Sequence, residues 1–132
     1  MQGETNLETL IKSMQPVLNE GEYVFATVTD SQKISRNDTI CEFKEKEGTT
    51  LVIEKSKADV LEINYSFTAA WITLNVHSSL DAVGLTAAFS AALAKNNISC
   101  NVIAGYYHDH IFVDKKDAKK AMQTLTALSK KA

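Results

Sequence analysis

The sequence predicts an α+β protein, and three observations lead to that fold class. Short apolar runs rich in β-branched residues alternate with segments of helical periodicity. From residue 67 onward, the order of these segments is strand, helix, strand, strand, helix. With 132 residues, the chain suits one domain or two small subdomains that share a core. The order β-α-β-β-α is one strand short of the ferredoxin-like unit βαββαβ, and we expect residues 23–28 to supply the missing strand.

The first half carries a helix pattern followed by three strand patterns. The expected elements are a helix over 6–14, a strand over 23–28, a loop over 29–39, strands over 41–46 and 50–53, and a helix over 56–63. Leu7, Leu10 and Met14 form an apolar stripe at helical spacing, which ends before Pro16. A turn at Gly48 predicts that the two later strands form a hairpin.

The second half shows a clearer pattern. The expected elements are a strand over 67–76, a helix over 80–95, a strand over 98–104, a turn over 105–108, a strand over 109–113 and a last helix. Leu85, Phe89 and Leu93 recur every four residues, so they form the buried stripe of the first of these helices. Asn97 can adopt the left-handed conformation that ends a helix, and Asp114 can cap the last helix.

Charge is unevenly distributed along the chain. Residues 1–64 carry 12 acidic and 7 basic side chains, whereas residues 65–132 carry 4 and 7. Only three formal charges lie between residues 65 and 113, which predicts burial in a core or in an oligomer interface. A net charge of −2 gives no reason to expect nucleic acid as a partner. Without a secretory or membrane-spanning segment, the two cysteines suggest reduced thiols in a cytoplasmic protein.

A binding site is predicted where the strand over 67–76 passes into the following helix. Ser78 and Asp81 have the spacing of a capping box, which would satisfy two backbone donors at the helix start. Gly84 would then lie inside the first turns, where glycine costs about 1 kcal/mol relative to alanine. Such a glycine suggests that a ligand or another backbone comes close, and a purely structural role is the alternative. Free N–H groups at a helix start can bind a small anion.

Other kinds of site are less well supported by the pattern. His77, His108, Asp109 and His110 include metal-ligand residue types, but on a strand Asp109 faces the side opposite to both neighbouring histidines. A metal site is therefore not expected. An acid–base enzyme that uses His108 and Asp109 lacks a nucleophile or a paired carboxylate. We therefore expect no catalytic activity and no cofactor.

Three segments of the second half resemble the ACT domain: residues 80–85, residues 97–99 and residues 109–113. Asp81 and Gly84 match the acidic residue and glycine at the first helix start, and Asn96-Asn97-Ile98 matches the N-x-I pattern before the second strand. The chain is most similar to small tandem ACT-like proteins, related to the ACT pairs of aspartate kinases and arginine sensors. The resemblance implies two intertwined ACT-like half-domains, residues 1–64 and 65–132, in a homodimer.

The resemblance also implies a non-catalytic regulatory protein that binds a small effector, such as an amino acid, and acts on a separate partner protein. The loop into the first helix and the neighbouring hairpin turn would bind the ligand, with Asp109 facing its ammonium group. The implied ligand-binding residues are His77, Ser78, Ser79, Leu80, Asp81, Ala82, Val83, Gly84, Gly105, Tyr106, Tyr107 and Asp109. The alternative is a structural dimerisation module or protein-partner adaptor without an effector, in which Tyr106 and Tyr107 fill an interface.

Overall fold

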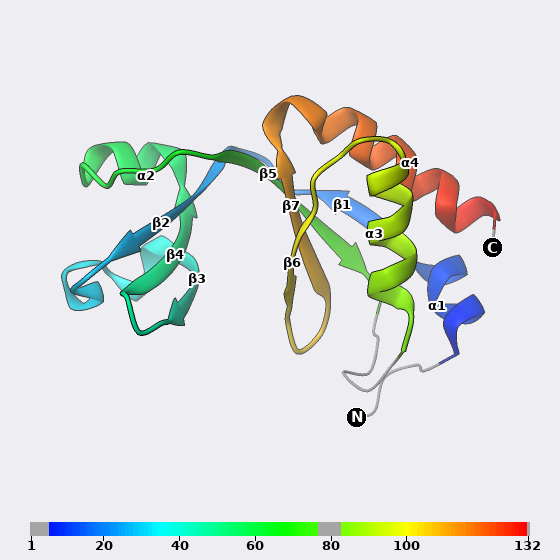
Figure 1. The fold of residues 1–132 in the computed structure, drawn as a ribbon, viewed down its shortest axis with the longest axis horizontal. Helices are drawn as coiled ribbons and strands as arrows, with labels where there is room; N and C mark the ends of the chain where they lie inside the picture. The colour runs from blue at the N-terminus through cyan, green and yellow to red at the C-terminus, as the bar shows by residue number, and fades with distance from the viewer. Residues whose placement is uncertain (1–5, 77–82, 132) are drawn as a thin grey trace. The chain divides into compact units, whose positions relative to one another are not determined.

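The computed structural model describes residues 6–76 and 83–131, and it divides the chain into two compact units (Figure 1). The first unit comprises residues 1–19 and 71–132, and the second comprises residues 20–70. The helices and strands in chain order are α1 (Leu7–Ser13), β1 (Gln15–Leu18), β2 (Tyr23–Val28), η1 (Ser31–Lys33), η2 (Arg36–Asp38), β3 (Thr39–Lys44), β4 (Thr49–Glu54), α2 (Lys55–Val60), β5 (Thr68–Asn75), α3 (Leu85–Lys95), β6 (Asn101–Ala104), β7 (Asp109–Asp114), η3 (Lys115–Asp117) and α4 (Ala118–Lys131). None of the helices in the described part of the chain is both long and apolar enough to cross a bilayer.

The first unit is a ferredoxin-like layer of helices on a sheet. Its strands lie in the order β1-β5-β7-β6, with β1 antiparallel to β5 and β6 antiparallel to β7. Helices α3 and α4 pack against each other, and α1 contacts both of them. The completely buried large side chains of this core come from every layer: Leu10, Ile72, Leu74, Phe89, Leu93, Ile111 and Leu125.

The strand that completes this unit is β1, so the prediction that residues 23–28 do so is wrong. Gln15 pairs with Asn75 and Leu18 with Ile72 along the edge of β5. Pro16 is tolerated there because an edge strand leaves some N–H positions without a ladder partner. The N-terminal segment thus joins the C-terminal half, which confirms the expectation of intertwined halves. The bounds 1–64 and 65–132 of those halves stay a prediction.

The second unit is a smaller sheet with one short helix. Its strands lie in the order β3-β4-β2, and the first residues of β5 continue beside β2. The predicted hairpin is confirmed, because β3 and β4 pair antiparallel around the turn at Gly48. Val24, Ile53 and Ala58 form a buried cluster in this unit.

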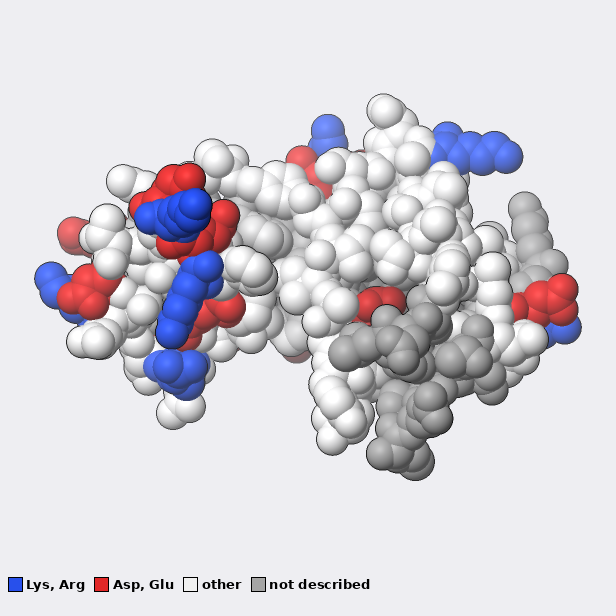
Figure 2. Space-filling model, turned by 60° about the horizontal axis from the view of Figure 1, so that its bottom comes forward, with Lys and Arg blue, Asp and Glu red and all other residues white. Residues whose placement is uncertain are grey.

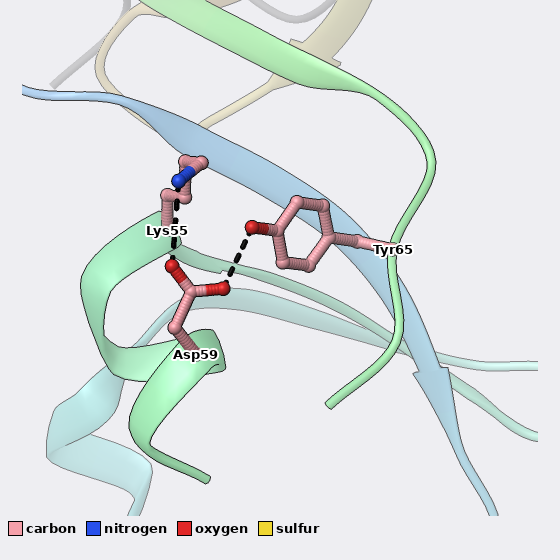
Figure 3. A network of polar contacts seen from close by, with 3 residues as sticks. All are labelled: Lys55, Asp59 and Tyr65. Carbon is pink, nitrogen blue, oxygen red and sulfur yellow. Dashed lines mark hydrogen bonds and ion pairs between the residues drawn. The ribbon is translucent and has the colours of Figure 1, made fainter. Parts of the chain in front are cut away.

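Helix α2 begins at Lys55, one residue before the predicted start at residue 56. Its N-cap is Glu54, which makes no side-chain capping bond, so Ser56 does not cap this helix. Asp59 instead accepts hydrogen bonds from Lys55, 3.3 Å away, and from the hydroxyl of Tyr65, 2.7 Å away (Figure 3). The Tyr65 bond is the largest of the effects that lower the pKa of Asp59. These bonds tie the chain after α2 back onto the helix.

Candidate functional site

The predicted ligand residues fall into three groups. Residues 77–82, with His77, Ser78, Ser79, Leu80, Asp81 and Ala82, lie outside the described residues, as does the predicted capping box. Val83 and Gly84 lie at the start of α3. Gly105, Tyr106, Tyr107 and Asp109 lie in or beside the turn between β6 and β7. Figure 1 shows this turn and the start of α3 at the same end of the unit.

Gly84 is the N-cap of α3 and lies before the helix, so the prediction of a helix from residue 80 is wrong. Its φ of 100° and ψ of −16° are left-handed, a conformation that L side chains rarely adopt. Its carbonyl accepts the N–H of Ala88 at 2.9 Å, which is the first bond of the helix. A Cβ at this position would lie 3.1 Å from Cδ2 of Leu7. The backbone conformation therefore favours glycine here, and a side chain at this position would also have to displace the end of Leu7 slightly.

The first turn of α3 has an uncapped N-terminus. As a glycine, the N-cap residue has no side chain that could accept a hydrogen bond from the helix, and the first turn contains no acidic residue. The cap residue therefore gives the N–H groups of Leu85, Thr86 and Ala87 no side-chain acceptor. Their partial positive charge favours an anionic group.

The turn between β6 and β7 is closed tightly by its backbone. The N–H of Gly105 donates to the carbonyl of His108 at 2.9 Å, and the Ala104–Asp109 pair begins the ladder. A Cβ on Gly105 would lie 2.9 Å from that same carbonyl oxygen, so only glycine fits without a shift. Tyr106 and Tyr107 project from the tip, 66% and 65% exposed, with their rings in edge-to-face contact.

His108 joins the turn to the end of β5. Its Nδ1 lies 3.3 Å from the carbonyl oxygen of Val76, the last residue described before the segment 77–82. A carbonyl only accepts hydrogen bonds, so Nδ1 of His108 carries the proton in this contact. The bond places the turn beside the entry to the predicted ligand loop.

Asp109 is a half-buried carboxylate at the start of β7. Desolvation by burial raises its pKa, and the neighbouring His110 opposes that shift. No residue in the ranges 6–76 and 83–131 makes a hydrogen bond or salt bridge to its side chain. A cation beside it would offset the cost of keeping this charge partly out of water.

His110 accepts a hydrogen bond from a side chain of β5. The indole N–H of Trp71 donates to Nδ1 of His110 at 3.0 Å. The spacing of Trp71 and Thr73 in the sequence indicates that both lie on one face of β5. The strand register that brings His110 opposite them was not predictable from the sequence.

Two other kinds of site can be compared with the described residues: a metal site and a surface groove. Within residues 6–76 and 83–131, no group of three or more His, Cys, Asp or Glu side chains is arranged to hold a metal ion. A groove of about 630 Å³ lies between α3 and α4, lined by Ala88, Ala91, Lys95 and Lys120 among others. It contains none of the predicted ligand residues.

Comparisons with known proteins agree with the fold. The sequence matches ACT domain family models over residues 2–70 and again over residues 66–127. No curated protein sequence matches the chain. A solved structure of a protein of unknown function from Vibrio cholerae, described as a possible transport protein, is 49% identical and has a TM-score of 0.84. The similarity covers 93% of this chain and 95% of that one.

Regulatory parts of aspartate kinases share the fold at low identity. The ligand-free regulatory subunit of aspartate kinase from Thermus thermophilus is 9% identical with a TM-score of 0.61, over 86% of this chain and 95% of that chain. The allosteric aspartate kinase of Clostridium acetobutylicum is 14% identical with a TM-score of 0.64, over 89% of this chain and 34% of the enzyme. ACT domains are typically ligand-binding regulatory modules without catalytic activity. With two such domains matched in tandem across nearly its whole length, this chain belongs to the ACT domain family.

Proposed function

We propose that this protein is a cytoplasmic sensor that binds a free amino acid, or a similar small zwitterion, and catalyses no reaction. The binding site is formed by the start of α3 and by the β6–β7 turn, together with residues 77–82. Asp109 carries the proposal, because it is a half-buried carboxylate without a hydrogen-bond partner among the described residues. In this proposal the sensor acts on a separate partner protein.

The two ends of an amino acid have complementary groups here. Asp109 is suited to the α-ammonium group, because a charge-assisted bond would relieve the desolvation that raises its pKa. The uncapped N–H groups after Gly84 are suited to the α-carboxylate. The His108 contact with Val76 holds the turn close to the chain that leads toward α3.

A thermal-shift screen against the free amino acids tests this function. A ligand at 100 times its dissociation constant adds about 2.7 kcal/mol of stability, which is several degrees for a chain of this size. Asp109→Asn should remove most of the shift for the amino acid, but little of it for an analogue that lacks the amine. Glu47→Gln removes one exposed negative charge elsewhere and should leave both shifts unchanged. Equal losses for both compounds in Asp109→Asn would contradict the role of this carboxylate.

A dimerisation or adaptor module is the second candidate function. Val83, Tyr106 and Tyr107 are large, exposed hydrophobic residues of the first unit. In Figure 2 the charged side chains gather over the unit of residues 20–70, and the visible face of the other unit carries few. This function predicts no shift with any amino acid, together with a stable homodimer in sedimentation experiments that Tyr106→Ser and Tyr107→Ser weaken.

A further inference from the structure

A side-chain network joins β5, β7 and the residue that follows β1. Trp71 and Thr73 alternate along β5 with the buried Ile72, so both project from the opposite face. The indole N–H of Trp71 and the hydroxyl of Thr73 lie 3.0 and 3.1 Å from the same atom, Nδ1 of His110. The side-chain amide of Asn19, which follows β1, donates to the Thr73 hydroxyl at 3.0 Å.

The network fixes the protonation state of His110. An indole N–H can only donate a hydrogen bond, so Nδ1 of His110 must present its lone pair and the ring proton must be on Nε2. The ring is therefore neutral in this arrangement. The surroundings agree, since desolvation by burial and then the proximity of His108 lower the pKa of His110, while Asp109 opposes them.

The other described groups that contact His110 carry no charge. Trp71 and Thr73 are its partners from β5, Ile103 is its partner in the β6–β7 ladder, and residues 15–18 of β1 carry no ionisable side chain. Among the described residues, His108 and Asp109 are the titratable groups whose charges act on His110. Nε2 of His110 would lie 3.2 Å from a Cβ placed on Gly105, so the imidazole ring also packs against the β6–β7 turn.

We propose that His110 is a proton-sensitive link between β5 and the β6–β7 turn. Protonation places an N–H on Nδ1, directly opposite the N–H of Trp71. The Thr73 hydroxyl can rotate and accept this new proton, whereas the indole cannot accept one. The Trp71 bond is therefore lost in acid, and the turn that packs on the imidazole loosens with it. This link belongs to the free protein and holds whether or not the turn binds a ligand.

The indole N–H resonance tests the proposal directly, because Trp71 is the only tryptophan in the chain. In ¹⁵N-labelled protein titrated from pH about 8 to about 5, this resonance should move in one step toward the position of a solvent-bonded indole. The midpoint should lie below about 6.5, the ordinary histidine pKa, and the Gly105 amide should shift with the same midpoint. His108→Gln should keep the step and move its midpoint upward, whereas His110→Gln should remove the step.

A step that persists in His110→Gln, or an indole resonance that does not respond to pH, would overturn the proposal. If His110→Gln does not fold, Trp71→Phe provides an independent readout. Loss of the indole donor destabilises the neutral imidazole, so the pKa of His110, measured from its ring carbon resonances, should rise toward about 6.5. An unchanged pKa in Trp71→Phe would refute the link as well.

Discussion

Substituting Gly84 by alanine tests the start of α3. The left-handed backbone at this residue costs an L-amino acid about 1–2 kcal/mol. Alanine also lowers the entropy of the unfolded chain, which offsets that loss of stability by about 0.4–1 kcal/mol. The added Cβ would lie 3.1 Å from Cδ2 of Leu7, the end of a flexible side chain, so a shift of a few tenths of an ångström relieves this contact. We therefore expect Gly84→Ala to lose about 1 kcal/mol, or roughly 3–6 °C in Tm.

Urea unfolding followed by Trp71 fluorescence measures this loss, since Trp71 lies in the same compact unit as Gly84. The midpoint should fall while the slope m stays constant, because the same surface is exposed on unfolding. Gly84→Asn is the matched control, since asparagine also adds a Cβ but tolerates the left-handed region better than alanine. It should lose less than Gly84→Ala. Equal losses would assign the effect to the Leu7 contact, and a stability unchanged in Gly84→Ala would refute the left-handed cap.

Three further predictions concern the same unit. Phe89→Ala removes a completely buried ring and should cost about 3–5 kcal/mol in urea unfolding, whereas Val83→Ala, at an 82% exposed position, should stay within about 0.5 kcal/mol. Burial raises the pKa of the Cys100 thiol to about 11, so iodoacetamide should react with it near pH 8 about 100-fold more slowly than with a thiol of pKa 9; equal rates would contradict its burial. Because burial raises the pKa of Asp109 in the fold, its contribution to stability is lost as the pH rises above its unfolded value of 3.8. Asp109→Asn should therefore raise Tm at pH about 7 and lose that advantage in acid, and a lower Tm at pH 7 would point to a stabilising partner for the carboxylate.

The strands and hairpins of this chain were predictable because their signals are local. The apolar run of β5, the turn at Gly48 and the turn at Gly105 each specify a short segment and its immediate neighbour. The choice of β1 as the fourth strand of the first unit was not predictable in this way. Pro16 looked like a helix terminator and nothing more, and its pairing with Leu74 depends on residues far apart in the sequence.

The start of α3 shows how a local pattern can mislead. The serine–aspartate spacing before Gly84 favoured a helix from residue 80, and the glycine was then interpreted as a helix-interior residue near a ligand. The left-handed conformation of Gly84 ends the preceding segment and places the helix start at Leu85. Helix α2 likewise begins at a different residue from the one expected, since its N-cap is Glu54. Of the two described parts of the predicted site, the β6–β7 turn lies where it was expected, whereas the helix begins five residues later than expected.

An NMR titration tests the central claim of amino-acid binding most directly. Each free amino acid is added at millimolar concentration to ¹⁵N-labelled protein, and amide shifts are mapped onto the chain. The proposed function predicts that one of them shifts the amides of Leu85, Thr86, Gly105 and Asp109 together, with one saturation curve, and that Asp109→Asn weakens this binding. If no amino acid moves these amides, or if the shifts cluster in residues 20–70 instead, the proposed site is wrong.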